Sequence, residues 1–325
     1  MKIVSLLLVG VIIVPNASAK DKSKYPMHTL KKGDLTVTVY LPDAEKGYYR
    51  GTRFDWSGLV GQATYKGHTF FGPWKAAHDP AYAEDADAIA EEFGINGPPS
   101  YSEAKAGEAF IKIGVGVLER PDDKPYSFMH PYKILAPGKW EIAHYDGAIE
   151  FIQDLQGPRG WSYRYIKRLS LNPTGTGFSV MHQLENTGKK AIETQHYCHN
   201  FVILDEQPVG PAYQLNFPFT LKAKRPMDAA RIDGTILGFS RELKEKEALF
   251  SELEGNQANS EHNHLVVKHA GKSIALTIDG DGTLDHFNFF AVRRSVCPEP
   301  FVNVKLEPGK TMRWKTTYTF AVGLK

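Results

Sequence analysis

Short runs of strand-forming residues, each closed by a turn, recur along nearly the whole sequence and limit the folds it can adopt. Residues 35–41 (LTVTVYL) alternate cleanly and end at Pro42, which is the pattern of a half-buried strand. Similar runs follow toward the C-terminus, and the stretches at 186–189 (NTGK) and 279–282 (DGDG) are typical of turns between strands. With 29 Gly and 20 Pro to supply turns, this spacing predicts one antiparallel all-β domain, a large sandwich over residues 20–325.

Two segments break the strand pattern and favour short helices. Residues 78–107 are acidic and rich in Ala, so we expect one short helix over 85–93 inside a long loop, and long loops in compact β domains are often functional. Residues 241–253 (RELKEKEALFSEL) are amphipathic and predict a second helix in a surface insert. The chain shows no internal repeat and no linker that would divide it.

The first 19 residues have the layout of a cleaved secretory signal peptide. Lys2 precedes an apolar run over 3–14, and the small residues Ala-Ser-Ala follow at 17–19. The apolar run is shorter than the roughly 20 residues needed to cross a bilayer, and no Cys follows it to carry a lipid anchor. We therefore expect a periplasmic or secreted protein with no membrane anchor, the alternative being a buried N-terminal strand.

The charge balance argues against one class of partner. Lys and Arg number 39 against 37 Asp and Glu, so the formal net charge is +2. Such a near-neutral balance offers no electrostatic attraction to nucleic acid or to anionic membrane surfaces. Aromatic residues make up 12% of the chain, a share that suits stacking on sugar rings and ordinary strand cores equally.

Residues 193–201 (ETQHYCHNF) place two histidines and one of the two cysteines on one expected strand. On a regular strand, His196 and Cys198 face one side and His199 faces the other. A β-bulge would exchange the two histidines. A second stretch, SVCPEP, carries the other cysteine and Glu299, which lies between two prolines and is therefore expected outside the middle of a sheet.

These two stretches and their surroundings resemble the aldose 1-epimerases, a group of galactose mutarotase-like proteins. The Thr-Gln-His at 194–196 stands where that family has Thr-Asn-His, and Asn200 stands where the family has its next Asn. Residues 296–320 resemble the family's closing segment, in which a Cys-x-Glu run precedes a strand, a Pro-Gly turn and a final Tyr-x-Phe strand. The resemblance covers about 160–325, and the first half matches only in its general strand pattern.

The resemblance implies a β-supersandwich whose concave face binds a monosaccharide. Interconverting anomers requires a base to take the proton of the anomeric hydroxyl and an acid to protonate the ring oxygen. By resemblance, Glu299 is the base and His196 is the acid, with His199 as the rival for the acid. Gln195 and Asn200 are then expected to contact the sugar, and no cofactor is expected.

The sequence also departs from the family's pattern in several places. Gln195 replaces the family's Asn, and His199 replaces an aromatic residue. No His-Gly-Gly run occurs in the first half, where many epimerases carry a second sugar-contacting histidine, so His68 or His78 would have to stand in for it. These differences bear on the identity of the substrate.

A dense cluster of basic and aromatic residues in the first half is a further candidate for sugar contacts: Arg50, Arg53, Trp56 and Trp74. Arg hydrogen-bonds hydroxyl groups through a fixed fork, and Trp stacks on a pyranose face. Arg53 and Asp55 are two residues apart and would face the same side of a strand, so the two side chains could equally form a structural ion pair.

Cys198 and Cys297 lie two residues from the expected acid and base, so they would be neighbours if those two groups converge. An oxidising compartment would then allow a disulfide, worth on the order of 4–5 kcal/mol by the loop-entropy relation. Two buried thiols are the alternative. The patterns at 262–264 (HNH) and 279–282 (DGDG) lack further ligands, so we expect no metal site.

Three functions stay open from the sequence. The first is an exported aldose 1-epimerase-like enzyme acting on a free sugar or a glycan end. The second is a non-catalytic carbohydrate-binding protein of the same fold. The third is a polysaccharide lyase with a Tyr or His base.

Overall fold

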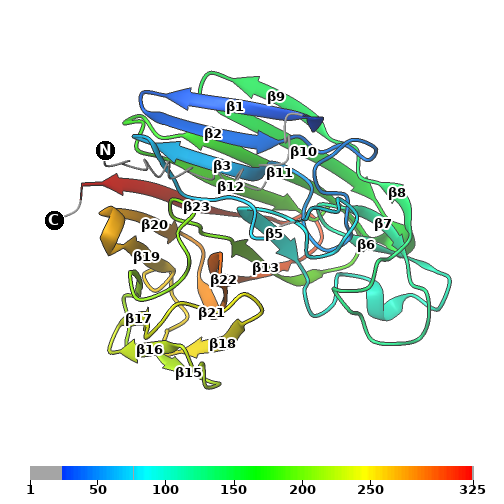
Figure 1. Ribbon diagram of the computed structural model, residues 1–325. Coiled ribbons are helices and arrows are strands. Elements are labelled where there is room, and N and C mark those ends of the chain that lie inside the picture. The colour runs from blue at the N-terminus through cyan, green and yellow to red at the C-terminus, as the bar shows by residue number, and fades with distance from the viewer. Residues whose placement is uncertain (1–23, 76, 324–325) are drawn as a thin grey trace, which may run out of the picture.

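Figure 1 shows a computed structural model of the chain, which describes residues 24–75 and 77–323. The signal peptide predicted over 1–19 lies outside these residues. Nearly all the regular structure described is β-strand, and every strand pairing in it is antiparallel. The predicted all-β class is confirmed. No helix in the described ranges is long and apolar enough to cross a membrane.

The strands form two ten-stranded sheets and one small sheet. The first sheet runs, in spatial order, β1 (Met27–Lys32), β2 (Leu35–Tyr40), β3 (Leu59–Tyr65), β5 (Ile89–Phe93), β13 (Ile192–Asn200), β22 (Ser295–Leu306), β21 (Leu284–Val292), β18 (Ala248–Glu254) and β15 (Lys222–Ala223), with β4 (His68–Thr69) paired to β3. The second sheet runs β16 (Ala230–Asp233), β17 (Ile236–Phe239), β14 (Tyr213–Asn216), β19 (His264–His269), β20 (Ile274–Gly280), β23 (Thr311–Val322), β12 (Gly177–Glu185), β11 (Ser162–Leu171), β10 (Ala148–Gln156) and β9 (Glu141–Tyr145). The small sheet contains β6 (Ala109–Lys112), β7 (Gly116–Glu119) and β8 (Ile134–Pro137). Within the described ranges, single-turn 3₁₀ helices lie at η2 (Tyr101–Glu103), η3 (Pro158–Gly160) and η4 (Ala270–Lys272).

The two large sheets pack face to face around one apolar core. Figure 1 shows β1–β3 lying over β10–β12. Residues from both layers, such as Val37 and Phe289 of the first sheet and Phe151 and Leu276 of the second, are buried in a single cluster. The strands were predicted from alternating apolar and polar residues. The apolar positions of each sheet therefore also define the face that packs against the other sheet.

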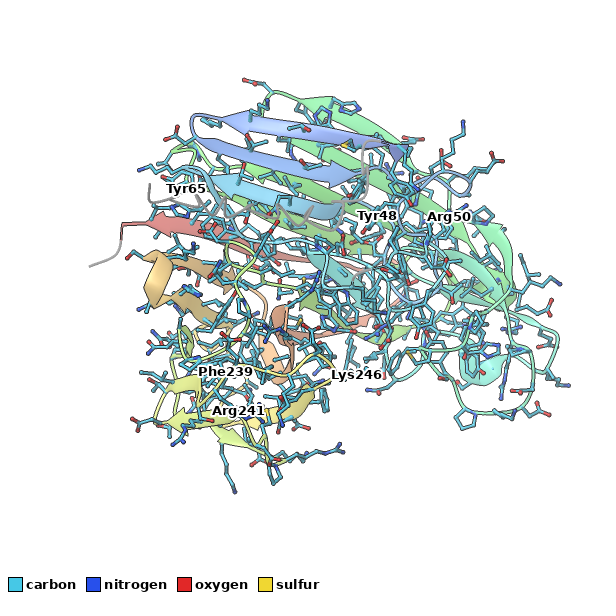
Figure 2. The ribbon with its side chains drawn as sticks, viewed as in Figure 1. Tyr48, Arg50, Tyr65, Phe239, Arg241 and Lys246 are labelled. Atoms are coloured by element: carbon cyan, nitrogen blue, oxygen red, sulfur yellow. The ribbon has the colours of Figure 1, made fainter. Side chains whose placement is uncertain are left out.

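The opposite face of the first sheet, here called the outer face, carries a second aromatic cluster. The loop between β2 and β3 contributes Tyr48, Phe54 and Trp56, which are buried with Phe201 and Cys297 of the sheet region. Tyr48 stacks on Tyr40 with ring centroids 4.0 Å apart. Figure 2 shows Tyr48 in this crowded region, to the right of Tyr65. The outer face near β5 and β13 is thus covered by loop side chains.

Strand β5 is buried at all five positions although two of them are glutamates. Glu91 is turned toward the second sheet, where Lys167 of β11 contacts its carboxylate. Glu92 is turned toward the outer face, where Arg53 and Lys112 lie 2.9 and 3.0 Å from its two oxygens. Because an unpaired buried charge is costly, these cations are what allow the strand to be buried.

Both helix predictions are wrong. Residues 85–93 end in strand β5, and residues 241–253 lead into β18, whose buried positions alternate (Leu249, Ser251, Leu253). In the first case the acidic and Ala-rich composition is typical of a solvent-exposed helix, but Glu91 and Glu92 are buried in ion pairs. In the second case a run of charged residues preceded a strand with period two, and the apparent amphipathicity came from joining the two.

We predict that Lys167→Ala destabilises the fold strongly. Lys167 contacts Glu91, lies 3.4 Å from Asp55 and donates to the Ser57 carbonyl at 2.6 Å. Removing it leaves two buried carboxylates without their cation, which should cost about 3–5 kcal/mol. Urea unfolding followed by Trp fluorescence measures the change.

The matched control is Lys133→Ala. Lys133 makes a similar ion pair with Glu119 (2.8 Å), but it is largely exposed, so its removal should cost less than about 1 kcal/mol. Equal effects from the two substitutions would contradict the role assigned to Lys167.

Candidate functional site

Strand β13 presents its side chains to two different environments. His196 lies against Trp314 and His182 of the second sheet, with ring centroids 5.1 and 4.7 Å apart. Tyr197 and His199 lie on the outer face, under the loop between β2 and β3. The strand follows the regular alternation, so the two histidines point in opposite directions.

The outer face brings His199 and Glu299 together. The Nε2 atom of His199 lies 3.0 Å from Oε1 of Glu299, and the two side chains are only 9% and 6% exposed. In the described part of the chain, Glu299 makes no other ion pair or hydrogen bond through its carboxylate. The His199–Glu299 pair is therefore a carboxylate and an imidazole held in direct contact under a nearly closed surface.

The pairing of β13 with β22 explains this contact. The register sets Tyr197 opposite Phe301, and the same register returns at Val202 opposite Val296. His199 and Glu299 are therefore directly opposite each other. The Val202–Val296 pair exchanges both backbone hydrogen bonds, so three residues away His199 and Glu299 form a non-hydrogen-bonded pair, in which side chains lie closest.

The two prolines that flank Glu299 do not remove it from the sheet, contrary to the sequence-based expectation. Pro298 and Pro300 lie inside β22, between β13 and β21. Their missing N–H groups fall at positions that would donate to β13, so the sheet loses two ladder hydrogen bonds there. The side-chain amide of Asn200 compensates in part by donating to the Pro298 carbonyl at 2.8 Å.

The imidazole of His199 is enclosed by aromatic rings and keeps one nitrogen unused. It stacks on Phe201 with centroids 4.0 Å apart, and the rings of Phe290 and Phe54 meet it edge-on at 5.6 and 6.2 Å. Nδ1 is buried and has no hydrogen-bond partner among the described residues. Because a buried nitrogen without a partner is costly, Nδ1 is a natural point of contact for a ligand hydroxyl or ring oxygen.

A buried ionic network lies next to this pair. Arg53 donates from Nε to Glu92 (2.9 Å) and from Nη2 to the Tyr197 hydroxyl (2.9 Å), and that hydroxyl donates to Glu92 at 2.7 Å. Burial opposes the ionisation of Glu92, but the charges of Lys112 and Arg53 outweigh it and hold the pKa of Glu92 below its ordinary value. The network fixes Tyr197 and Arg53 in place beside His199.

The other residues predicted to bind a sugar are spread over several environments. Trp74 stacks on Phe201 with centroids 5.0 Å apart and so covers the ring next to His199. Trp56 is buried and donates to the Gly51 carbonyl, and Arg50 donates to the Glu45 carbonyl. Asn200 faces the second sheet and accepts from Tyr318. Gln195 lies further along the outer face, beside Asp285 and Asn303.

Neither of the two histidines considered as stand-ins reaches the pair. His68 lies 2.7 Å from Asp205, and His78 stacks on Tyr48 and lies 3.1 Å from Asp85. Both are engaged in local contacts that hold loops. The structure therefore offers His199 alone, of the candidate histidines, next to Glu299.

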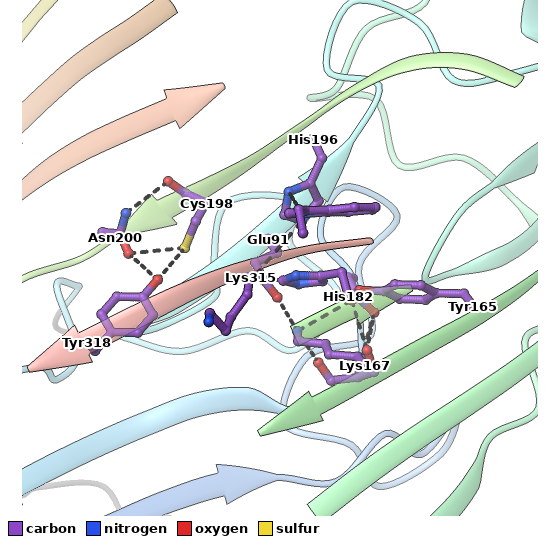
Figure 3. A network of polar contacts seen from close by, with 12 residues as sticks. Glu91, Tyr165, Lys167, His182, His196, Cys198, Asn200, Lys315 and Tyr318 are labelled. Carbon is purple, nitrogen blue, oxygen red and sulfur yellow. Dashed lines mark hydrogen bonds and ion pairs between the residues drawn. The ribbon is translucent and has the colours of Figure 1, made fainter. Parts of the chain in front are cut away.

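His196 belongs to a different group of residues, the interlayer cluster of Asp55, Glu91, Lys167, His182 and His196, which no motif in the sequence indicated. Figure 3 shows Lys167 and His182 converging on Glu91. Burial, together with the neighbouring His182, holds the pKa of His196 well below its ordinary value. His196 is thus neutral and faces away from Glu299, so the structure does not place the predicted acid with the predicted base.

The interlayer cluster contains one set of groups with metal-ligand character. Ligand atoms of Glu91, His182 and His196 lie within 4.8 Å of one another. However, the indole N–H of Trp314 donates to Nδ1 of His196 at 3.1 Å, which leaves the proton of the neutral ring on Nε2, the atom that would have to bind a metal. The ammonium of Lys167 already neutralises Glu91. The donor set therefore does not fit a cation.

Of the two alternatives left open for the cysteines, a disulfide or two buried thiols, the structure has the two thiols. Cys198 faces the second sheet, where its sulfur lies 3.5 Å from the Tyr318 hydroxyl, and Cys297 belongs to the aromatic cluster on the outer side, where its sulfur lies 3.3 Å from Ser295. Both are free and buried. Their strands are neighbours, but the side chains emerge on opposite faces of one sheet.

Fold and geometry together define a two-layer β-sandwich with a buried carboxylate–imidazole pair on the outer face of one sheet. Comparison with solved structures gives this class its name, the galactose mutarotase-like fold. The chain is similar to a protein of Synechocystis sp. PCC 6803 (TM-score 0.58, 12% identity, covering 92% of this chain and 96% of that one). It is also similar to a candidate aldose 1-epimerase of Escherichia coli K12 (0.56, 12%, 91% and 99%) and to a galactose mutarotase-like protein of Clostridium acetobutylicum (0.56, 10%, 93% and 100%).

These likenesses show the fold. No protein-family model matches the sequence, and no curated protein matches it. The superfamily resemblance drawn from the sequence motifs is supported at the level of the fold, and the chemistry of the site has to be argued from its own residues.

We predict two free thiols in this protein. Denaturing it without reductant and titrating with a thiol reagent should yield two reactive groups per chain, because Cys198 and Cys297 are both unpaired. A Cys198→Ala, Cys297→Ala double variant contains no thiol and gives the background signal of the reagent. Finding no thiols in the unreduced wild-type protein would contradict the placement of the cysteines on opposite faces.

We also predict that His196 makes the fold sensitive to mild acid. The native state resists protonating His196, whereas the unfolded chain binds that proton as the pH falls below about 6.5, so unfolding takes up a proton and stability falls. The expected loss is about 1.4 kcal/mol per pH unit, starting below the unfolded pKa and ending at the depressed native one. Urea unfolding of the wild type and of His196→Gln between about pH 7.5 and about pH 5.5 measures it. Identical pH dependence of the two proteins would rule out this role.

Proposed function

We propose that this chain is an exported, carbohydrate-active protein that interconverts the anomers of a sugar, with Glu299 and His199 as the base and the acid. The single observation that carries the proposal is the contact between these two side chains on the outer face of the first sheet. The fold, which is similar to that of a candidate aldose 1-epimerase, supports it. Export is inferred from the signal-like residues 1–19.

The chemistry requires two proton transfers in each direction. Glu299 takes the proton of the anomeric hydroxyl as the C1=O double bond forms and the bond between C1 and the ring oxygen breaks. The electron pair of the broken bond stays on the ring oxygen, which takes a proton from His199. After rotation about the C1–C2 bond the ring closes on the other face of the carbonyl, and both protons return. General acid and base groups typically contribute about 10²–10⁴-fold each.

The contacts of His199 suit the acid role. Its Nε2 faces Glu299 at 3.0 Å, so Nδ1 is the nitrogen left to meet the ring oxygen. The surrounding rings of Phe54, Phe201 and Phe290 exclude water from the imidazole. Arg53, whose Nε and Nη2 are taken by Glu92 and Tyr197, supports the site through that network.

The lyase alternative is less consistent with these contacts. Tyr197 lies two residues before His199 on the same face of β13, and burial raises its pKa well above the ordinary value. Its hydroxyl is bonded to Glu92 and Arg53. A tyrosine held neutral in this way is a poor base for abstracting a proton from a uronate.

A non-catalytic sugar-binding protein is the second candidate, because the low exposure of the pair weighs against catalysis there but not against sugar binding in the hollow beside Gln195 and Asn303. With side chains only 9% and 6% exposed, His199 and Glu299 present little surface to a substrate unless the covering loop residues move. Binding without rate enhancement distinguishes this candidate from the epimerase.

We predict that Glu299→Gln and His199→Ala each lower the rate of anomer equilibration by about 10²–10⁴-fold, because each removes one proton-transfer group. Polarimetry or NMR on freshly dissolved pure anomers of glucose, galactose, xylose and mannose measures the rate.

Two conservative surface changes serve as controls: Glu307→Gln, in the turn after β22, and His264→Ala, at the start of β19. Both should retain the wild-type rate, since neither contacts the outer-face site. If the wild type accelerates no pure anomer but binds sugar by calorimetry, the binding-protein candidate replaces the epimerase.

A further inference from the structure

We propose that the outer face continues into a second saccharide subsite, an amide-lined groove beyond His199 and Glu299, and that the ligand is a neutral oligosaccharide rather than a single sugar. This inference rests on the proposed function for the position of the first sugar. The amide groove is defined as the hollow lined by Asn96, Gln195 and Asn303 together with neighbouring residues of β13 and β22. Its cavity volume is about 410 Å³.

The amide groove is in line with the His199–Glu299 pair. Gln195 and Asn303 are paired in the register of β13 and β22, as His199 and Glu299 are, and each lies an even number of residues from its counterpart. All four side chains therefore share the outer face. At a rise of about 3.3 Å per residue, Asn303 is about 13 Å along β22 from Glu299, which is farther than one monosaccharide extends.

An aromatic stack occupies the strand positions between the two places. Tyr197 and Phe301 stack with ring centroids 4.4 Å apart, and His286 stacks on the other side of Phe301 at 4.2 Å. Tyr197 and Phe301 are buried, while His286 is half-buried. Of the three rings only that of His286 reaches the surface, and its stack on Phe301 fixes its position, so a glycan chain running from the pair to the groove would cross this ring without having to order it.

The polar groups of the groove are pre-ordered around one carboxylate. Asp285 accepts from Gln195 at 3.2 Å and from Asn303 at 2.7 Å, and His286 Nδ1 lies 2.7 Å from it. Asn96 donates to Gln195 at 3.4 Å. Each amide side chain has more donor and acceptor capacity than these bonds use, so the groove can bind hydroxyl groups both as donors and as acceptors.

The charges of the groove select against a charged ligand. Glu193 and Lys305, which line it, neutralise each other at 3.0 Å. Asp285 is surrounded by amide donors, and the nearby side chains offer no cluster of Arg or Lys that would bind a phosphate or a uronate. A neutral hydroxyl-rich chain matches this surface.

A larger hollow continues the groove away from the pair. It has a volume of about 700 Å³ and shares Asn96, Gly97 and Glu193 with the amide groove before it reaches Tyr126 and Trp161. The two hollows together form a path along the end of β5 and β13. This continuity favours a ligand of several sugar units over a second, separate monosaccharide.

Calorimetry with graded oligosaccharides tests the inference. Neutral α-1,4-glucans, β-1,4-glucans, β-1,4-xylans and β-1,4-mannans of one to four units are titrated into the wild type and into a Gln195→Ala, Asn303→Ala double variant. For the series that binds, the dissociation constant of the wild type should fall at least about tenfold from one unit to three, about 1.4 kcal/mol. The double variant should lose that gain while binding the monosaccharide as the wild type does.

Gln257→Ala, an exposed amide in the turn after β18, is the matched control and should keep the full gain. Equal affinity for one and three units, or an unchanged gain in the double variant, overturns the subsite and shows an ordinary solvated sheet face. If oligosaccharides bind with the expected gain but no anomer is equilibrated faster, the subsite stands and the epimerase activity fails. If monosaccharide anomers are equilibrated faster but chain length has no effect on affinity, the epimerase activity stands and the subsite fails. If no saccharide binds, the proposed activity and the subsite both fail.

Discussion

Two adjacent carboxylates on one buried strand impose the central constraint on this structure. Glu91 and Glu92 leave β5 on opposite faces, and each must be neutralised where no water reaches it. Lys167 and His182 approach Glu91 from the second sheet, while Arg53 and Lys112 approach Glu92 from the loops and the small sheet. The same ion pairs that make β5 tolerable in the interior therefore join the two large sheets and fasten the covering loop beside the candidate site.

This constraint also explains where sequence reasoning succeeded and where it failed. Alternating runs and turn residues correctly predicted an antiparallel all-β sandwich. The alternation of apolar and polar residues in each strand directly reflects which of its two sides is buried. At 85–93 the pattern did not predict a strand. Two glutamates are expected to be solvent-exposed unless the cations that pair with them are known. Those partners lie at positions 53, 112, 167 and 182, and nothing local in the sequence connects them to β5.

The candidate site shows the same limit. Parity along β13 correctly separated His196 from His199, but parity alone does not tell which side faces the second sheet. That choice depends on Trp314 and His182, whose packing against His196 emerges only when β12 and β23 come together. The family resemblance favoured His196 by its place in a Thr-x-His run, whereas the geometry assigns the contact with Glu299 to His199.

The prolines that flank Glu299 have a mechanical consequence. Over the few residues where β13 and β22 carry His199 and Glu299, the two strands share fewer backbone hydrogen bonds than anywhere else along their pairing, and side chains such as Asn200 hold them instead. Elsewhere, separating the strands would mean breaking ladder bonds; here the spacing is governed by side-chain packing. The pairing of β13 and β22 is therefore more easily deformed around His199 and Glu299, the proposed acid and base, than on either side, where ladder hydrogen bonds keep the register that sets the two side chains opposite each other.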